Sequence, residues 1–355
     1  MKTRVALIFG GRSAEHEVSC VSASHVAAAM DPDRYEVVSI GITKTGEWVL
    51  PDPAVPGGGA FKAEGRPIEV FGPFGASASP DAATAGLEFD VVFPVLHGPF
   101  GEDGTIQGML EMAGCPYVGS GVLGSAVGMD KAMMKTAFSA AGLPSARAAT
   151  VRGADWEGRR VEILDQACLL GFPSFTKPAN LGSSVGISRC VDADAVAAGI
   201  DLALQFDTKA LVEEGIPGRE IECAVLGNDD PQASVCGEII PGREFYDYEA
   251  KYVEPSSKTI VPADLPEVVT TLIRSYSVAA FKAVEAAGLA RVDFFYDESG
   301  RGVVINEINT MPGFTEISMF PKLWAAGGMS YPELIDKLIE LALERHSAKP
   351  RGGVI

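Results

Sequence analysis

Two apolar runs decide the fold, Arg291-Val-Asp-Phe-Phe295 and Val303-Val-Ile-Asn-Glu-Ile-Asn309, and Asp-Glu-Ser-Gly-Arg-Gly at 297–302 lies between them. Branched and aromatic residues on both sides of a glycine-containing turn predict a β-hairpin. Side chains alternate between the two faces of a strand, so the hairpin fixes which polar residues of these runs share a surface.

One face of this predicted hairpin gathers oxygen ligands. Glu307 and Asn309 project the same way, and Asp293 on the partner strand can join them. Such a set suits Mg²⁺, which is usually held by one or two carboxylates and completed by phosphates and water. Arg291 shares the face and could meet an anion. The alternative is a surface hairpin with solvated charges, but acidic residues inside apolar runs are not typical of one.

The composition is that of a globular protein with an acidic surface. The 355 residues predict two or three domains with sizeable cores. The hydrophobic share of 47% and the charged share of 21% are ordinary. A formal net charge of -18 opposes general binding to nucleic acid or membrane surfaces. A nucleotide would therefore need basic groups gathered locally around its phosphates.

Cysteine usage and hydropathy predict a cytoplasmic protein. The six cysteines form no CxxC pair and no metal-ligand spacing, which is typical of small core residues in a reducing compartment. The apolar run Val5–Phe9 is too short for a signal peptide. The longest uncharged stretch, Met112–Met129, contains five glycines and Pro116 and is a poor membrane span.

The first part of the chain alternates strand and helix patterns. Buried-type strands are predicted at Val5–Phe9, Tyr35–Ile42 and Asp90–Leu96. With helical spacing from Val18 to Met30, this alternation predicts an open parallel α/β domain over residues 1–125. Ligands of such sheets bind beyond the carboxyl ends of the strands. Gly10–Glu15 and His97–Asp103 both occupy such ends.

The remaining segments predict two further domains. Pro51–Ala83 is rich in Pro, Gly and Ala and is interpreted as an irregular, exposed insertion in the first domain. A helix is expected over 129–143, within a second α/β domain over 126–212. Residues 213–355 form the third domain, with the hairpin and a closing helix from Tyr331 to about His346.

A loop that suits phosphate follows a predicted strand. Lys177 ends the strand, and Gly182-Ser-Ser-Val-Gly186 can offer backbone N–H groups to phosphates. Gly/Ser loops are common, so a plain flexible hairpin explains this motif equally well. The sequence has no GxxxxGK[ST], which excludes a P-loop. Gly119–Gly124 matches GxGxxG but lacks the ribose-binding acid about 20 residues on, so it is interpreted as a turn and helix start.

Two other features narrow the chemistry. Tyr246–Tyr252 is a dense polar-aromatic segment, either a decorated surface loop or, as its packed tyrosines beside Lys251 favour, a lid that closes over an anionic substrate and excludes water. Of the four histidines only His97 follows a candidate strand beside glycines. No nucleophile-elbow sequence appears, so a hydrolase triad is not indicated.

In this order the motifs resemble those of the D-alanine–D-alanine ligases of the ATP-grasp superfamily, over nearly the whole chain. The motifs that carry the resemblance are Gly10–Glu15, His97–Asp103, Met129–Lys131, Lys177 with Gly182–Gly186, Tyr246–Tyr252, Arg291–Asp293 and Glu307–Gly313. Each is weak alone, but seven in sequence leave little room for chance. The resemblance implies a three-domain α/β ATP-grasp architecture.

The resemblance also implies a nucleotide and metal site. ATP phosphates would be bound by Lys131 and Lys177 with the loop residues Ser183 and Ser184. Adenosine would be contacted by Glu213, Glu214, Ile216, Glu220, Phe245 and Phe295. Asp293, Glu307 and Asn309 would hold two Mg²⁺ ions, with Mn²⁺ as a substitute. At Glu214-Gly215 some relatives carry Lys and an aromatic residue instead. This departure affects ATP affinity only if side chains, and not the backbone, make the adenine-side contacts.

The substrate roles follow the same resemblance. Glu15 would pair with the ammonium of the first D-alanine, close to His97, and Ser183 and Tyr252 would link to Glu15 and close the loop. Arg291 and the Gly313 N–H would stabilise the oxyanion. The carboxylate of the second D-alanine would be held by Ser318, the Met319 N–H and Lys251.

The expected reaction is the ATP-dependent joining of two D-alanines for the cell wall, with a homodimer implied by the family alone. A carboxylate is a poor electrophile, and phosphoryl transfer converts it to an acyl phosphate that an amine can attack. The main rival is another ATP-grasp carboxylate–amine ligase, such as one using D-lactate or D-serine. Tyr246–Tyr252 resembles the dipeptide-forming type instead. A non-catalytic regulatory protein is disfavoured by the intact metal and phosphate residues, and a Rossmann oxidoreductase by the missing ribose acid.

Overall fold

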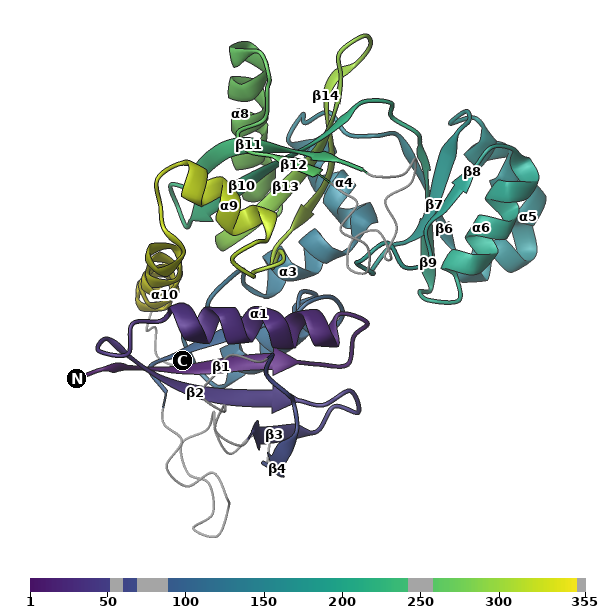
Figure 1. Ribbon diagram of the computed structural model, residues 1–355. Helices are drawn as coiled ribbons and strands as arrows, with labels where there is room; N and C mark the ends of the chain where they lie inside the picture. Colours follow the sequence, from purple (N-terminus) through teal and green to yellow (C-terminus); the bar gives the residue numbers. More distant parts are fainter. Residues whose placement is uncertain (52–59, 69–88, 242–257, 350–355) are drawn as a thin grey trace.

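The computed structural model describes residues 1–51, 60–68, 89–241 and 258–349, whose strands form three sheets (Figure 1). The strands are β1 Thr3–Gly10, β2 Tyr35–Ile42, β3 Trp48–Pro51, β4 Gly65–Pro67, β5 Val91–Val95, β6 Ala148–Arg152, β7 Ser174–Pro178, β8 Ser188–Cys190, β9 Lys209–Glu214, β10 Arg219–Gly227, β11 Gln232–Ile240, β12 Lys258–Ile260, β13 Gly288–Asp297 and β14 Gly302–Asn309. The helices are α1 His16–Ala29, α2 Thr105–Met112, α3 Val122–Met129, α4 Lys131–Ala140, α5 Gly153–Cys168, α6 Ala193–Ala203, α8 Glu267–Ala283, α9 Met319–Ala326 and α10 Tyr331–Ala348.

The N-terminal sheet has the order β4-β3-β2-β1-β5. The strands β2, β1 and β5 are parallel, because β1 pairs in parallel with both β2 and β5, while β3 and β4 continue the sheet beyond β2 as antiparallel strands. β1 is fully buried from Val5 to Gly10, as expected of a parallel strand covered on both faces. The predicted open α/β domain is therefore confirmed. Because β1 and β5 are parallel neighbours, the loops that follow them start at the same end of the sheet. This brings Gly10–Glu15 beside His97–Asp103.

One part of the predicted insertion is ordered sheet. Within 51–83 the structure describes Pro51 and residues 60–68, where Gly65–Pro67 forms β4 on the edge of β3. Ala63 and Ile68 on either side are buried and join the two cores of the N-terminal domain. The expectation of irregular structure was wrong here, because Gly65–Pro67 pairs with β3 and Ala63 fits against Gly10 and Gly41. The expected exposure holds for most of residues 60–68, including all of β4.

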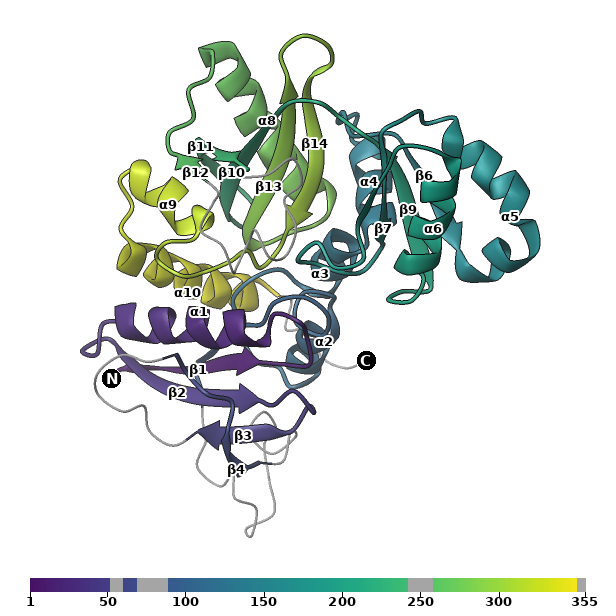
Figure 2. The ribbon, with the colours of Figure 1, turned by 45° about the vertical axis from the view of Figure 1, so that its right-hand side comes forward.

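The second sheet is antiparallel, with the order β12-β11-β10-β13-β14, and contains the predicted hairpin as β13 and β14. α8 packs on one face of it (Figures 1 and 2). Met134 and Phe138 of α4 belong to the same core as Ile273 and Phe281 of α8. Helix α4 therefore packs with the second sheet and carries Lys131 to its edge.

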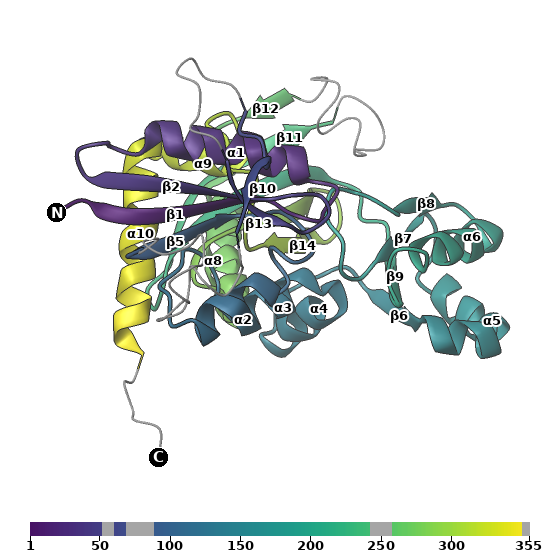
Figure 3. The same ribbon diagram turned by 90° about the horizontal axis from the view of Figure 1, so that it is seen from below.

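The third sheet forms a separate lobe beside the other two, with the order β6-β9-β7-β8 and with α5 and α6 on it (Figure 3). Its small core includes Trp156, Val196 and Ile200. The loop that follows β7 leads from this lobe toward the other two sheets. The predicted domain boundaries near residues 125 and 212 stay a prediction.

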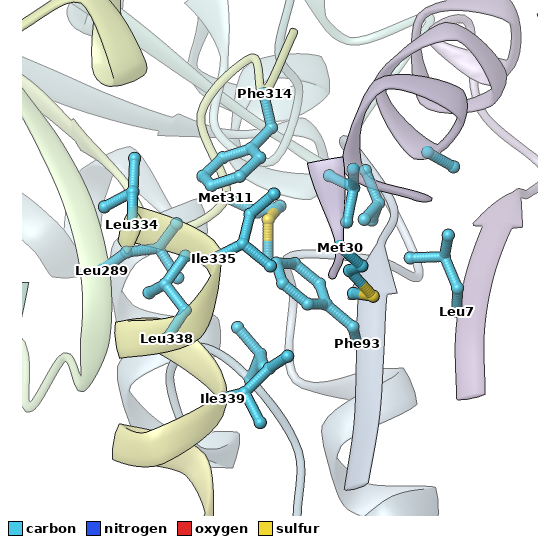
Figure 4. Packing of buried hydrophobic residues seen from close by; sticks show 14 of the residues in the cluster. Leu7, Met30, Phe93, Leu289, Met311, Phe314, Leu334, Ile335, Leu338 and Ile339 are labelled. Carbon is cyan, nitrogen blue, oxygen red and sulfur yellow. The ribbon is translucent and has the colours of Figure 1, made fainter. Parts of the chain in front are cut away.

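Helix α10 joins the N-terminal and second sheets. Its apolar face presents Leu334, Ile335, Leu338 and Ile339 to a shared core that also holds Leu7, Met30, Phe93, Leu289, Met311 and Phe314 (Figure 4). Each fully buried aliphatic side chain of this kind contributes about 1.5–3 kcal/mol. This packing fixes the segment around Met311 against the N-terminal sheet, so both can contribute to one site. No helix among the described residues is both long and apolar enough to cross a membrane.

Candidate active site

The hairpin face gathers the predicted oxygen ligands. Asp293 lies opposite Glu307, and Arg291 lies opposite Asn309, with a bulge directly after Asp293. The Asn309 amide donates a 3.0 Å hydrogen bond to Asp293 Oδ2. The predicted sharing of one face is confirmed. Among the described residues no three His, Cys, Asp or Glu side chains form a metal-binding group, and the third ligand here is an amide.

Arg291 is the centre of what we call the acidic cluster: Glu222, Asp293 and Glu307 around Arg291. Its guanidinium donates two 2.7 Å hydrogen bonds to Asp293, and its Nε lies 3.0 Å from Glu222 Oε2. Burial disfavours the charged guanidinium, but Asp293 and Glu222 outweigh it and raise the pKa of Arg291. Sequence reasoning missed Glu222. Its spacing of two from Glu220 on a strand was the available signal, and its register opposite Asp293 needed the structure.

A second charged group, the lysine–glutamate triad, consists of Lys135, Lys177 and Glu213. Lys177 Nζ lies 2.5 Å from Glu213 Oε2 and Lys135 Nζ lies 2.9 Å from Glu213 Oε1. Burial alone would raise the pKa of Glu213, but the two lysines lower it. The predicted adenosine contact Glu213 is thus held by a predicted phosphate lysine. Lys135 was missed, although it lies one helical turn after Lys131.

Lys131 lies between the two charged groups. Its Nζ donates a 2.7 Å hydrogen bond to the Leu181 carbonyl and lies 3.9 Å from Glu307 Oε2. The side chain is 10% exposed, and burial lowers its pKa. Asp130 caps α4 by accepting from the N–H groups of Ala132 and Met133, which fixes the start of the helix beside the glycine-rich loop.

The glycine-rich loop reaches the N-terminal domain. Ser183 and Ser184 both have positive φ, at 52° and 59°, which favours glycine and costs energy for serine. The Ser183 hydroxyl donates to Glu15 Oε1, at the start of α1. A Cβ on Gly182 would lie 3.1 Å from Glu15 Oε2. The expected link between Ser183 and Glu15 is confirmed, and Gly182 leaves room for it.

His97 and Glu102 hold the backbone of Met311. The Met311 carbonyl lies 3.0 Å from His97 Nδ1, which must therefore donate, so Nε2 is left to accept from Ser22. Burial lowers the pKa of His97. Glu102 accepts from the N–H groups of Gly98 and Met311. Burial and the nearby Glu15 raise the pKa of Glu102 to about 8. Both His97 nitrogens are therefore engaged within the protein.

The predicted second-substrate residues lie at the start of α9. Ser318 is the N-cap residue, and its hydroxyl accepts from the Thr315 N–H at 3.1 Å. The N–H of Met319 opens the helix and has no acceptor within it, which suits a carboxylate. A Cβ on Gly313 would lie 3.3 Å from the Ser318 hydroxyl, so Gly313 lies close to this terminus.

The predicted adenosine residues lie on three strands and a turn. Glu214 is committed to Arg147 and Arg301, so only its backbone is left for a nucleotide. Glu220 on β10 lies opposite Phe295 on β13, and half-buried Ile216 lies between β9 and β10. Three further predicted residues lie outside the described part of the chain: Phe245, Lys251 and Tyr252.

One pocket is lined by residues of the acidic cluster, the glycine-rich loop and the N-terminal domain, together with Lys131. The predicted site residues that line it are Glu15, His97, Lys131, Ser183, Ser184, Arg291, Glu307, Asn309 and Gly313, and Glu102 lines it too. Asp293 is bound to the lining residue Arg291, and Lys177 and Glu213 lie near enough to Lys131 to shift its pKa. The pocket thus combines Glu307 on β14 and Arg291 on β13 with Lys131 on α4 and Glu15 at the start of α1.

This arrangement of sheets defines a protein of the ATP-grasp fold class. The chain belongs to the D-alanine–D-alanine ligase family. Residues 4–120 match the D-ala D-ala ligase N-terminus and residues 137–340 match the D-ala D-ala ligase C-terminus.

Individual relatives cover nearly the whole length. A D-alanine–D-alanine ligase of Natranaerobius thermophilus is 49% identical over 361 residues, covering 99% of this chain and 97% of the relative. The solved D-alanine-D-alanine ligase of Coxiella burnetii is 38% identical, with a TM-score of 0.82 and coverage of 98% and 95%. The VanG D-Ala:D-Ser ligase of Enterococcus faecalis also has a TM-score of 0.82, at 36% identity and coverage of 96% and 100%.

Proposed function

We propose that the protein joins two D-alanines to D-alanyl-D-alanine, through a D-alanyl phosphate, with conversion of ATP to ADP and phosphate. The observation that carries this proposal is the pocket that Arg291, Glu307, Lys131 and Glu15 line together. Family membership over nearly the whole chain supports the same activity.

The acidic cluster fits a hard divalent cation. Asp293, Glu307 and Asn309 present oxygen atoms on one strand face, and the three carboxylates of the cluster exceed the single charge of Arg291. We assign two Mg²⁺ ions, or Mn²⁺, to these three residues. When bound, the metal would neutralise charge on the transferred phosphoryl group.

The first step needs groups that hold ATP and the first D-alanine. Lys131 and Lys177 would neutralise the phosphates, and the N–H groups of the loop around Ser183 and Ser184 would cover them. Glu15 would bind the ammonium of the first D-alanine, while its bond to Ser183 ties that substrate to loop closure. The D-alanine carboxylate then attacks the γ-phosphorus, and ADP leaves.

The second step needs an oxyanion site and a grip on the incoming amino acid. Arg291 and the Gly313 N–H would stabilise the tetrahedral oxyanion as the amine attacks and phosphate leaves. Ser318 and the Met319 N–H would hold the second carboxylate at the start of α9. An acyl phosphate hydrolyses in water, so we also assign Lys251, Tyr252 and the segment 246–252 to a closing lid.

The biological setting follows from the product. We assign the dipeptide to peptidoglycan precursor synthesis in the cytoplasm, where ATP is available, and we expect a homodimer. Both are tested directly, by cell fractionation and by mass measurement in solution.

The test of the function is a substrate panel. Phosphate release from ATP is measured with D-alanine, L-alanine, or D-alanine mixed with D-serine or D-lactate, and product masses are recorded. We expect release with D-alanine alone and a product of two D-alanines. Release only with D-serine or D-lactate would instead assign the protein to the specificity named for the VanG relative, or to a depsipeptide-forming ligase. No release with any amino acid would reject the ligase.

A further inference from the structure

The lysine–glutamate triad contains one charged residue that the proposed mechanism does not use. Lys135, Lys177 and Glu213 have side chains that are 10%, 8% and 6% exposed. Each carboxylate oxygen of Glu213 faces a different lysine. With two ammonium groups and one carboxylate, the triad carries a net positive charge of one.

The three side chains meet because of local register. Glu213 lies opposite Phe175 on the neighbouring strand β7, and Lys177 lies two residues further on, so both project from the same face. Lys135 reaches them from α4 and also donates a 3.2 Å hydrogen bond to the Ala146 carbonyl, in the segment that enters the third sheet. The Lys135 ammonium is therefore held by two groups of the protein, the Glu213 carboxylate and the Ala146 carbonyl.

The two lysines differ in what they are free to do. Lys177 lies near the end of β7, the strand that leads into the glycine-rich loop, and its ammonium contacts Glu213. If this side chain turns toward a phosphate, it gives up its contact with that carboxylate. Glu213 would then be buried with a single partner, and a buried carboxylate without any partner is strongly unfavourable.

We propose that Lys135 is a positioning residue of the nucleotide site, which holds the Glu213 carboxylate charged and oriented while Lys177 moves from Glu213 to the ATP phosphates. This inference rests on the proposed function, because it takes Lys177 as a phosphate ligand. Lys131 cannot take the same part, since its ammonium is bound to the Leu181 carbonyl and faces Glu307.

The experiment measures ATP binding and steady-state kinetics in the full chain. For Lys135→Met we expect the Kd of ATP to rise at least about tenfold, the equivalent of about 1.4 kcal/mol, while the KM of D-alanine changes less than about twofold. Lys135→Arg keeps the charge and should restore most of the affinity. In Lys135→Met with Glu213→Gln the buried carboxylate that Lys135 would hold is itself absent, so ATP affinity should return to that of Glu213→Gln alone.

A matched control separates this effect from loosening of the helix–strand junction. Lys209, at the start of β9, pairs with Asp130 at the start of α4, so it joins the same two elements through a half-buried lysine–carboxylate pair. Lys209→Met should lower thermal stability as much as Lys135→Met but change the Kd of ATP less than about twofold.

Three results would overturn the proposal. These are an unchanged ATP Kd in Lys135→Met, an equal loss of affinity in Lys209→Met, or no recovery when Glu213→Gln is added. If Lys135→Met does not fold, the Arg variant and the double variant still decide between these results. Failure of the proposed function is distinguishable, because then wild type itself would bind no ATP or Lys177→Met would bind it normally.

Discussion

The acidic cluster and the lysine–glutamate triad lie on either side of Lys131 but carry opposite surplus charge. The acidic cluster sets three carboxylates against one guanidinium on the second sheet. The triad sets two ammonium groups against one carboxylate, between the third sheet and α4. Both are largely removed from water.

The difference indicates what each group binds. A buried surplus of charge is costly unless a ligand of opposite sign completes it. We therefore expect the acidic cluster to bind a cation, and the triad together with Lys131 to bind an anion. ATP with Mg²⁺ supplies both signs in one ligand, so each cluster should respond to a different component of it.

The sharpest test of this contrast is Glu307→Gln. The variant keeps the shape but removes one negative charge from the cation side, so turnover should fall about 10²–10³-fold, as when a group that stabilises developing charge is removed. The Mg²⁺ concentration for half-maximal rate should rise, while ATP binding without metal should stay close to wild type. The measurement is a Mg²⁺ titration of initial rates, with circular dichroism to check folding. Near-normal turnover at ordinary Mg²⁺ would contradict the assignment.

A smaller effect is expected at Glu222, on the same cluster. Its carboxylate is the second partner of Arg291. It would still hold the Arg291 guanidinium if Asp293 bound a metal ion. Glu222→Gln should lower kcat about 10–100-fold, the usual cost of removing a supporting residue around a metal site. The KM of ATP should change little, since the triad is untouched. The measurement is steady-state kinetics with ATP varied. A raised KM of ATP with an unchanged kcat would mean that Glu222 contacts the nucleotide instead.

The hairpin and its ligand face were predictable because a strand has a strict period of two. Arg291, Asp293, Glu307 and Asn309 could be placed on one face from spacing alone, and the structure agrees. The bulge after Asp293 lies beyond these residues, so it did not disturb the prediction.

The partners of those residues were harder to predict, because they come from distant segments. Glu222 meets Arg291 through strand pairing across almost 70 positions, and no local pattern encodes that register. Lys135 looks like any helix lysine until α4 is placed against β9. The strand at 65–67 was hidden by a loop-like composition. Family resemblance supplied the role of Glu213, but its engagement by two lysines required coordinates.

A third test probes the loop that lies between the two clusters. Ser183→Ala removes the hydroxyl that binds Glu15, and a hydrogen bond to a charged group is worth about 1.5–3 kcal/mol. We expect the KM of the first D-alanine to rise about tenfold, with less change for ATP. Ser183→Gly loses the same hydroxyl but tolerates the positive φ of 52°. Equal KM values with higher stability for the Gly variant would support this account, and an unchanged KM in both would refute it.

The smallest effect should appear at Glu102, which belongs to neither cluster. Its pKa is raised from 4.5 to about 8 by burial and by Glu15. As pH rises from about 5 to 8 the unfolded chain loses this proton and the folded chain keeps it, so unfolding becomes easier through this window. The stability that Glu102 contributes is thus greatest at low pH and lost as pH approaches the folded pKa. Glu102→Gln cannot titrate.

The difference in Tm between wild type and Glu102→Gln should therefore depend on pH. At pH 5 the Gln variant should melt below wild type, because an amide keeps only one of the two acceptors that bind the Gly98 and Met311 N–H groups. Between pH 5 and 8 the difference in Tm should move by a few degrees in favour of the variant. Thermal melts of the two unliganded proteins in matched buffers provide the comparison. Parallel Tm curves across this range would mean that Glu102 is ionised in the folded protein, and the pocket would then hold one more negative charge beside Glu15 for the substrate ammonium to neutralise.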